Sequence, residues 1–324
     1  MSMSGKKYPV PPLLSQTADV QMQMTLRQIG FDAASKAPKP SALMPPASPP
    51  RNEEALALKR RDWLLGTMER QRALSSYASG LLTAENLPGE AFLHDFYATG
   101  RPVVIKGAMA GWPALEKWTP DYLADTIGDA VVEYQGGREG AGDYELAKDR
   151  HKRRAPFRAF LALIRDGGND AYITAYNSSA NATAFAPLEK DLGRLDAYLT
   201  RAPGMLWIGP KDTFTPLHFD LTNNLLAQVT GTKRVILVPP SQTARMAHRR
   251  HVFSDVHDLT DPARLALHPA ARDVLHYEVV LNPGDLLFIP IGWWHQLRSE
   301  SFSTMLTYTN FQWPNIGHEE YPAG

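Results

Sequence analysis

Short apolar runs separated by turn residues dominate the chain from residue 205 onward, and they constrain its fold more than any other feature. Stretches such as LLAQV and RVILV are rich in Leu, Val and Ile, and Pro, Gly, Asn or Asp stand between them. Runs of this length with such boundaries are typical of short antiparallel strands in a sandwich or barrel. We therefore predict a mostly β domain over residues 205–312.

The preceding segment mixes both kinds of element. The stretch RPVVIKGAMAGWPALEKWTPDYLADTIGDAVVEY, which begins at Arg101, predicts strand, loop, helix and strand in that order, FRAFLALIRDG predicts a helix, and DAYITAYN predicts a strand. Residues 101–177 should therefore add flanking helices and strands to the β domain.

The first hundred residues have a different composition. Prolines recur through residues 1–50, which favours extended and poorly packed chain, so we predict a Pro-rich N-terminal tail. Residues 51–79 are good helix formers and carry a loose apolar stripe, made of Leu56, Trp63, Leu64, Met68 and Leu74. We expect a helix that packs on the domain or on a second subunit. The predicted organisation is a tail (1–50), a helical extension (51–100) and a β domain (101–324).

Charge and composition exclude several classes of protein. Lys plus Arg equal Asp plus Glu at 34 each, so no overall field attracts nucleic acid or an anionic membrane. No apolar run approaches the roughly 18 residues that a membrane span needs. We predict a cytoplasmic protein with no nucleic-acid partner. Because the chain has no cysteine, any metal site must use His, Asp or Glu.

The stretch TPLHFD places His218 and Asp220 two residues apart. Residues at this spacing in a strand project from the same face, so both side chains can reach one point. Burying the pair without a partner would cost several kcal/mol, by a rough estimate, and a divalent metal is the strongest counter-charge available. A pair of this kind also occurs by chance on protein surfaces, so a third ligand is required.

His295 supplies the third ligand. It follows two tryptophans in NPGDLLFIPIGWWHQL, after a Pro-Gly-Asp turn, one strand and a second turn. Two histidines and one carboxylate on one face of a metal leave positions open, which suits Fe(II) with a co-substrate and dioxygen. We therefore predict that His218, Asp220 and His295 bind iron and form the catalytic centre.

The residues that surround these ligands carry a resemblance to a known family. TPLHFD, NNLLAQVTGTKRVILVPP, PGDLLFIPIGWWHQL and TYTNFQW resemble the cupin-like JmjC family of Fe(II)- and 2-oxoglutarate-dependent oxygenases. Within it they are most similar to the asparaginyl hydroxylase that inhibits hypoxia-inducible factor. The resemblance implies a double-stranded β-helix, or jelly-roll, and hydroxylation that uses Fe(II), 2-oxoglutarate and O2.

The same resemblance implies which residues hold 2-oxoglutarate. Lys233 and Thr215 match the family's lysine and threonine for the distal carboxylate, and Tyr172 matches a tyrosine with the same task, with Tyr176 as its rival. By composition alone, Lys233 is a solvated turn lysine beside Arg234.

Two asparagines are implied to complete the pocket. Asn224 and Asn310 match family positions that line it, although the neighbouring asparagines at 223 and 224 equally suit a turn. Gln228 lies on the same predicted strand face as Asn224, where it either bonds a substrate or satisfies a buried backbone group. Trp293 and Trp294 are expected in the core.

Three functions are compatible with these motifs. The first is hydroxylation of a protein or peptide side chain, the second is the same chemistry on a small molecule such as an amino acid or natural product, and the third is a non-catalytic ligand-binding protein. Loops outside the motif strands decide among substrates. The basic runs RHKRRAPFR and HRRH are usually solvated surface, with an acidic peptide or ligand as the alternative partner. If the protein is a homodimer, we expect the helix that begins at Arg51 to form the interface.

Overall fold

A computed structural model describes residues 51–74, 80–142 and 144–322. The predicted Pro-rich tail, residues 1–50, lies outside the described residues. The strands and the candidate site belong to one compact unit, Leu56–Gly324.

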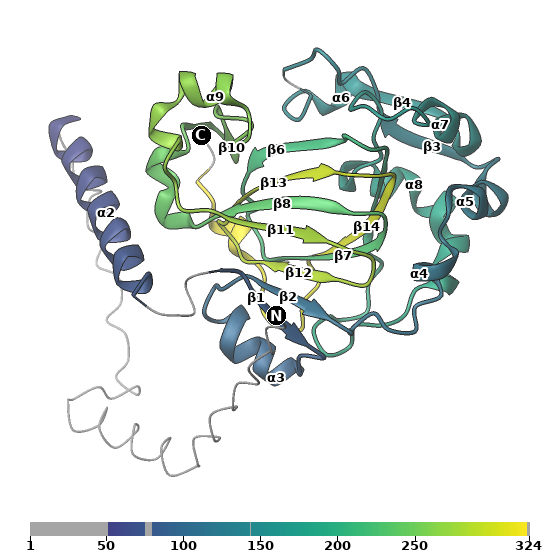
Figure 1. Ribbon diagram of the computed structural model, residues 1–324, viewed down its shortest axis with the longest axis horizontal. Helices are drawn as coiled ribbons and strands as arrows, with labels where there is room; N and C mark the ends of the chain where they lie inside the picture. The colour runs from purple at the N-terminus through teal and green to yellow at the C-terminus, as the bar shows by residue number, and fades with distance from the viewer. Residues whose placement is uncertain (1–50, 75–79, 143, 323–324) are drawn as a thin grey trace, which may run out of the picture. The chain divides into compact units, whose positions relative to one another are not determined.

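Two six-stranded sheets form the centre of this unit (Figure 1). In spatial order the first contains β1 (Leu82–Glu85), β2 (Val103–Lys106), β12 (Leu286–Ile289), β7 (Asn224–Thr230), β14 (Ser303–Tyr308) and β5 (Met205–Gly209). The second contains β11 (Tyr277–Leu281), β8 (Lys233–Val238), β13 (Trp294–Ser299), β6 (Phe214–His218), β10 (Phe253–Ser254) and β9 (His248–Arg250). All pairings are antiparallel except that of β1 with β2.

Apolar side chains from both sheets meet between them. This cluster includes Val104, Leu226, Leu287 and Met305 from the first sheet and Val235, Leu237 and Leu297 from the second. Alternation along the strands explains it, because β8 sends Val235 and Leu237 inward while its neighbours face away. The strands are mostly antiparallel in two packed sheets, so the predicted jelly-roll over residues 205–312 is confirmed.

Helices cover the outer face of the first sheet. A second cluster joins Val103, Leu225 and Phe288 of that sheet to Phe92 and Trp118 outside it. The covering segments are α3 (Gly89–Phe92), a π-helical turn (Leu93–Tyr97), α4 (Ala114–Lys117), α5 (Pro120–Ile127), α7 (Phe157–Leu163), α8 (Ser178–Phe185) and a 3-10 turn (Ala186–Asp191). The hairpin of β3 (Val131–Gln135) and β4 (Lys152–Pro156) follows α5, with α6 (Lys148–His151) in its connection.

A third cluster lies against the end of the second sheet. Leu217 and Trp294 pack there on Met246, Val256 and Val274. The segment that contributes them contains α9 (Pro262–Leu267) and 3-10 turns at Pro240–Arg245 and Pro269–Ala271; a further turn, Gly317–Glu320, follows the last strand. Burial of Trp293 and Trp294, at 2% and 0% exposure, confirms their predicted core role.

Two expected elements differ from the structure. DAYITAYN is not a full strand: Tyr172 and Ile173 make single bridges, and a 3-10 turn, Ala175–Asn177, follows. That turn forms because Asn177 accepts from the backbone and hydroxyl of Thr174. The segment expected as a helical extension contributes β1 to the first sheet, so this sheet begins before Arg101. The boundary between extension and domain at 101 stays a prediction.

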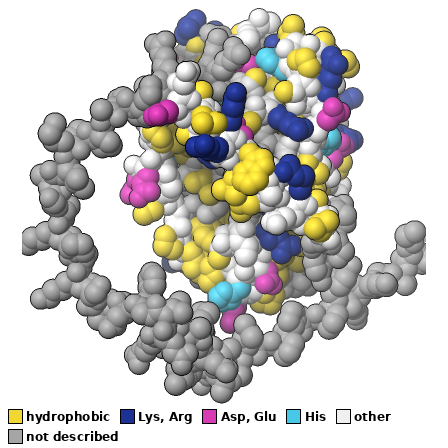
Figure 2. All heavy atoms as spheres, turned by 90° about the vertical axis from the view of Figure 1, so that its left-hand side faces the viewer, with side chains coloured by type: hydrophobic (Ala, Val, Ile, Leu, Met, Phe, Trp, Pro, Cys, Tyr) yellow, Lys and Arg dark blue, Asp and Glu magenta, His cyan; other side chains and the backbone are white. Residues whose placement is uncertain are grey.

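The predicted N-terminal helix is α2 (Arg51–Arg72), but its apolar stripe does not pack on the domain. Leu56, Trp63, Leu64 and Met68 are 45–66% exposed and Leu74 is 86% exposed. Contacts run instead through the last turns, where Glu69 accepts from Ser241 and Arg72 lies over Trp293. Figure 2, which views the left-hand side of Figure 1, shows hydrophobic side chains interspersed with Lys and Arg at the surface. Packing of the stripe on a second subunit stays a prediction.

No helix in the part of the chain that the structure describes has the length and apolar character that crossing a membrane requires.

Candidate metal centre

Neighbouring strands bring the three predicted ligands together. His218 ends β6 and lies directly opposite His295 of β13, while Asp220 follows two residues after His218. The His218 Nε2 lies 3.8 Å from Asp220 Oδ1, and the His295 Nε2 lies 3.7 Å from Asp220 Oδ2. One ligand atom from each residue lies within 4.8 Å of the other two. Two nitrogens and a carboxylate therefore converge on one point.

Backbone carbonyls fix the orientation of both imidazole rings. The Nδ1 of His218 lies 2.8 Å from the Pro216 carbonyl oxygen, and that of His295 lies 2.9 Å from the Trp293 carbonyl oxygen. A carbonyl oxygen only accepts, so each Nδ1 carries the proton and each Nε2 presents its lone pair to the common point. Metal-binding histidines in proteins are oriented in this way.

Electrostatics favour the protonation states that a metal needs at two of these residues, His295 and Asp220. Burial lowers the pKa of His295 to about 4, and the neighbouring His218 adds to the effect. Burial opposes ionisation of Asp220, but the facing imidazoles and the Asn224 amide outweigh it, so the pKa of Asp220 is lowered. A neutral imidazole and an ionised carboxylate result.

Two further side chains hold this centre. Asn224, at the start of β7, donates its amide to Asp220 Oδ2 over 3.0 Å, and its own Oδ1 is buried without a partner. The Phe253 ring stacks on the His218 ring, with centroids 5.7 Å apart and planes at 26°. Both contacts restrict the metal-facing side chains to one arrangement.

The three ligands line a cavity of about 250 Å³ between the two sheets. Its other lining residues are Glu145, Lys148, Tyr172, Thr174, Ala175, Tyr176, Met205, Trp207, Thr215, Thr222, Asn224, Leu226, Val252, Phe253, Leu297, Met305, Thr307 and Thr309. Lining residues two apart on one strand, such as Met205 and Trp207 or His295 and Leu297, occur because a strand presents every second residue inward.

A buried cation lies beside this cavity. Lys233 is 1% exposed, and its Nζ donates to the Tyr172 hydroxyl over 2.8 Å. Burial lowers the pKa of Lys233 to about 7. Among the residues that the structure describes, no acidic side chain forms an ion pair with it. Tyr172 and Thr215 both line the cavity, so the region around Lys233 suits an anion that enters there.

Comparison with known proteins identifies the fold family. Residues 88–316 match the model of the Cupin-like domain. The chain belongs to the cupin-like family.

Several relatives of this cupin-like chain carry JmjC names. It is 31% identical to Jumonji C domain-containing protein 5 of Drosophila melanogaster over 68% of this chain and 57% of the relative. It is also 31% identical to Lysine-specific demethylase JMJ30 of Arabidopsis thaliana, over 70% of this chain and 53% of the relative. The chain is also 29% identical to the tRNA wybutosine-synthesizing protein 5 of Danio rerio, over 72% of this chain and 74% of the relative. The chain thus spans little more than half the length of the first two relatives.

Not every predicted site residue faces the cavity of the cupin-like domain. Asn310 donates its amide to the Thr200 carbonyl over 2.6 Å and is not among the lining residues, so its role in binding 2-oxoglutarate stays a prediction. Gln228 donates to the carbonyls of Thr230 and Gly231, which confirms the backbone-satisfying alternative. The particular likeness to the asparaginyl hydroxylase also stays a prediction.

Sequence reasoning missed a buried group behind Tyr172. Arg138 is 1% exposed and donates to the Phe214 carbonyl over 2.8 Å and to Gln135 Oε1 over 3.2 Å. Its guanidinium also lies over the rings of Tyr144 and Tyr172, 4.3 and 5.1 Å from their centroids. The Gly-Gly pair before Arg138 interrupts any periodic pattern of apolar residues. The sequence therefore gives no signal that this arginine is buried.

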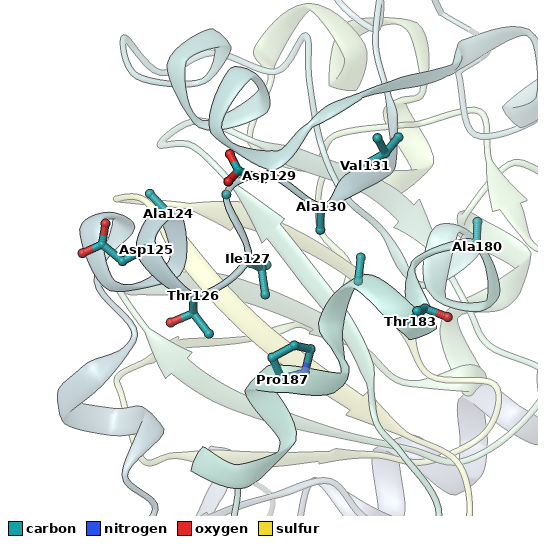
Figure 3. A pocket seen from close by; sticks show the side chains of 12 residues that line it. Ala124, Asp125, Thr126, Ile127, Asp129, Ala130, Val131, Ala180, Thr183 and Pro187 are labelled. Carbon is teal, nitrogen blue, oxygen red and sulfur yellow. The ribbon is translucent and has the colours of Figure 1, made fainter.

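A second groove of about 360 Å³ lies between the end of α5 and α8 (Figure 3). Ala, Thr, Ile, Val and Pro side chains form most of its wall, and Asp125 and Asp129 are its charged residues. It has no histidine and no cation, so we assign no chemistry to it.

Proposed function

We propose that this cupin-like protein is an Fe(II)- and 2-oxoglutarate-dependent dioxygenase that hydroxylates a C–H bond of a protein or peptide side chain. One observation carries the proposal. A cavity with a converging His, Asp and His set also contains Tyr172, whose hydroxyl binds the buried cation Lys233. This combination supports a redox metal and a dicarboxylate as the two ligands.

The donor set fits iron. Two imidazole nitrogens and one carboxylate on one side of an ion are typical of non-haem Fe(II) oxygenases, because the remaining positions stay open. Asn224, whose amide already bonds to Asp220, leaves its buried Oδ1 without a partner beside these positions. When bound, Fe(II) supplies O2 activation, with 2-oxoglutarate as the source of electrons.

The chain's own residues would bind and orient the co-substrate. Lys233, Tyr172 and Thr215 would hold the distal carboxylate, since a buried ammonium without an anion is costly until one binds. Leu226, Leu297 and Met305 line the cavity wall and exclude water from the region that the co-substrate would occupy.

The substrate class is the finer part of the proposal. Relatives named as a lysine-specific demethylase and a tRNA wybutosine-synthesizing protein support a macromolecular substrate. The cavity mouth carries Glu145, Lys148 and the partly exposed Tyr176, which offers polar contacts to a peptide backbone. A free amino acid and a non-catalytic ligand-binding role are the alternatives that experiment must separate.

The test is formation of succinate from 2-oxoglutarate by the Fe(II)-loaded protein. We expect turnover by the wild-type chain and none by His218→Ala, because the variant lacks a ligand. His94→Ala removes an exposed histidine that does not line the cavity and is the matched control. Tight 2-oxoglutarate binding without any succinate, in the presence of O2 and reductant, would favour the ligand-binding role. Stimulation of turnover by free amino acids but not by peptides would favour a small-molecule substrate.

A further inference from the structure

The mouth of the cavity carries cations that the proposed chemistry does not use. Lys148 lines the cavity beside Tyr176, which is 41% exposed. The Tyr176 ring has Lys148 Nζ at 5.6 Å and Lys152 Nζ at 4.8 Å from its centroid. Tyr176 therefore links the interior of the cavity to a charged outer surface.

That surface carries more cations than carboxylates, although Lys148, Lys152 and Arg154 pair with Glu145, Asp149 and Glu133. Between Glu145 and Arg158 the chain has six Lys or Arg residues and two acidic ones, although the whole chain is balanced at 34 of each. Lys152, Arg153 and Arg154 are exposed and adjoin Lys148. We call these four residues the basic ledge. Because its excess of positive charge lies at the cavity mouth, it would attract an anionic partner there.

Contacts with neighbouring groups hold the ledge in place. Asp149 pairs with Lys152 over 2.7 Å and accepts from the Tyr176 hydroxyl over 2.7 Å, and Glu133 pairs with Arg154 over 3.0 Å. Arg153 donates to the carbonyls of Arg150 and Lys152. The cations are therefore pre-positioned, and their ordering on binding costs less.

We propose that the basic ledge and Tyr176 bind an acidic segment of a protein substrate, so that a neighbouring side chain of that segment enters the cavity. The proposal rests on the function proposed above and deepens it. Strand β4 is five residues long, about 16 Å at strand spacing, which matches five residues of extended peptide. Leu146, 46% exposed beside the ledge, offers an apolar contact as well.

A peptide fits the ledge better than a nucleic acid does. Specific and non-specific nucleic-acid binders contact about 6–10 phosphates along an extended basic surface. Here the carboxylates of Asp149 and Glu133 pair with Lys152 and Arg154 and so interrupt the cations. A regular phosphate backbone would meet these carboxylates, whereas a peptide can place its acidic side chains between them.

The experiment measures fluorescence anisotropy of a labelled 12-residue peptide of Glu, Leu and Ser, at 50 and 200 mM salt. We expect wild-type protein to bind it, and the double variant Lys152→Gln/Arg153→Gln to bind about tenfold more weakly, since each rim charge contributes modestly. Tyr176→Ala should also weaken binding, which would locate the peptide at the cavity mouth. The matched control, Lys190→Gln/Arg201→Gln, removes two exposed charges elsewhere and should bind as wild type.

Three results would overturn the inference. The first is that a peptide with Lys in place of Glu binds the wild-type protein as tightly as the acidic peptide does. The second is that the double variant binds the acidic peptide as tightly as wild type. The third is that a 12-nucleotide single-stranded RNA binds more tightly than the acidic peptide and loses affinity in the double variant. The assay needs neither iron nor 2-oxoglutarate, so it separates this inference from the proposed function. Succinate formation without peptide binding refutes the ledge alone, and peptide binding without succinate formation refutes the oxygenase alone.

Discussion

The metal end of the cavity and the Lys233 end differ in whether the buried ionisable group has partners. At the metal end, Asp220 lies between two imidazoles and accepts from the Asn224 amide, and the pKa of its carboxyl is lowered, so the anionic form is favoured. At the other end, Lys233 has a tyrosine hydroxyl and no ion-pair partner among the described residues. The first end is formed in advance, whereas the second lacks the anion that we propose binds there.

The largest effect should follow loss of a metal ligand. His218→Ala removes one of three donors, and loss of a ligand should exceed the roughly 10–100-fold loss seen for outer contacts of metal sites. We expect Fe(II) affinity, measured anaerobically by calorimetry, to fall by more than about 100-fold. Wild-type iron affinity in this variant would show that the three side chains are not the metal site.

Removal of Lys233 should have the next largest effect, confined to the other end. Lys233→Ala leaves the bound carboxylate without its partner, a loss of about 2–5 kcal/mol, or about 30-fold to several thousand-fold in 2-oxoglutarate affinity. Iron binding should be unchanged. Arg234→Gln is the matched control, because Arg234 is half-exposed and pairs with Glu278 and Glu300. A loss of co-substrate affinity in the control alone would assign the carboxylate to Arg234.

Removal of the Lys233 charge weakens co-substrate binding, but it should not lower the stability of the ligand-free protein. Lys233 has a lowered pKa, so the unfolded chain binds more protons between about pH 7 and 10.5. The free energy of unfolding of the ligand-free protein should therefore rise with pH in that window. Lys233→Met should be neutral or stabilising by about 1–4 kcal/mol at pH 7. Chemical denaturation at pH 7 and 9 measures both, and a less stable Lys233→Met would mean that the ammonium is well paired in the empty protein.

The contrast also explains what the sequence could predict. Strand parity and turn residues identified His218, Asp220 and His295, because ligands on neighbouring strands keep a local pattern. Family resemblance was needed for Lys233 and Tyr172, which come from elements 61 residues apart. No periodicity covers the glycine-rich connection that holds Arg138 and Glu145, so neither the burial of Arg138 nor the position of Glu145 at the cavity wall could be predicted.

The apolar stripe of α2 does not pack on the domain, which was one of the two predicted alternatives, and this difference has a related cause. A loose apolar stripe indicates a helix but does not say what covers it. The contacts that attach the helix are polar or cationic, from Glu69 to Ser241 and from Arg72 to Trp293. A pattern of apolar residues gives no sign of polar or cationic contacts, so these two contacts could not be predicted from the sequence.

Co-substrate binding should depend on pH through the Lys233 end only. The empty protein holds Lys233 with a pKa of about 7, and a bound carboxylate raises that pKa. Affinity for 2-oxoglutarate should therefore be full below pH 7 and fall about tenfold per unit above it. Calorimetry at pH 8.5 in two buffers of different ionisation enthalpy should detect uptake of nearly one proton. Lys233→Arg stays charged, so a pH dependence that persists in this variant would arise from the metal end instead.

The smallest predicted effect tests the packing that positions Tyr172. A Cβ on Gly209 of β5 would lie 2.6 Å from Tyr172 Cδ2 and 2.7 Å from Thr213 Oγ1. Because an aromatic ring cannot bend away as a flexible chain can, Gly209→Ala must displace the Tyr172 ring and its hydroxyl from Lys233. We expect about a tenfold loss in 2-oxoglutarate affinity, since roughly one hydrogen bond to a charged group is lost, with iron affinity unchanged. Tyr172→Phe removes the hydroxyl without moving the backbone and should reproduce this loss. If Gly209→Ala weakened binding while Tyr172→Phe did not, the displaced group would be Thr213 or the strand itself, and the Tyr172 hydroxyl would have no part in holding the anion.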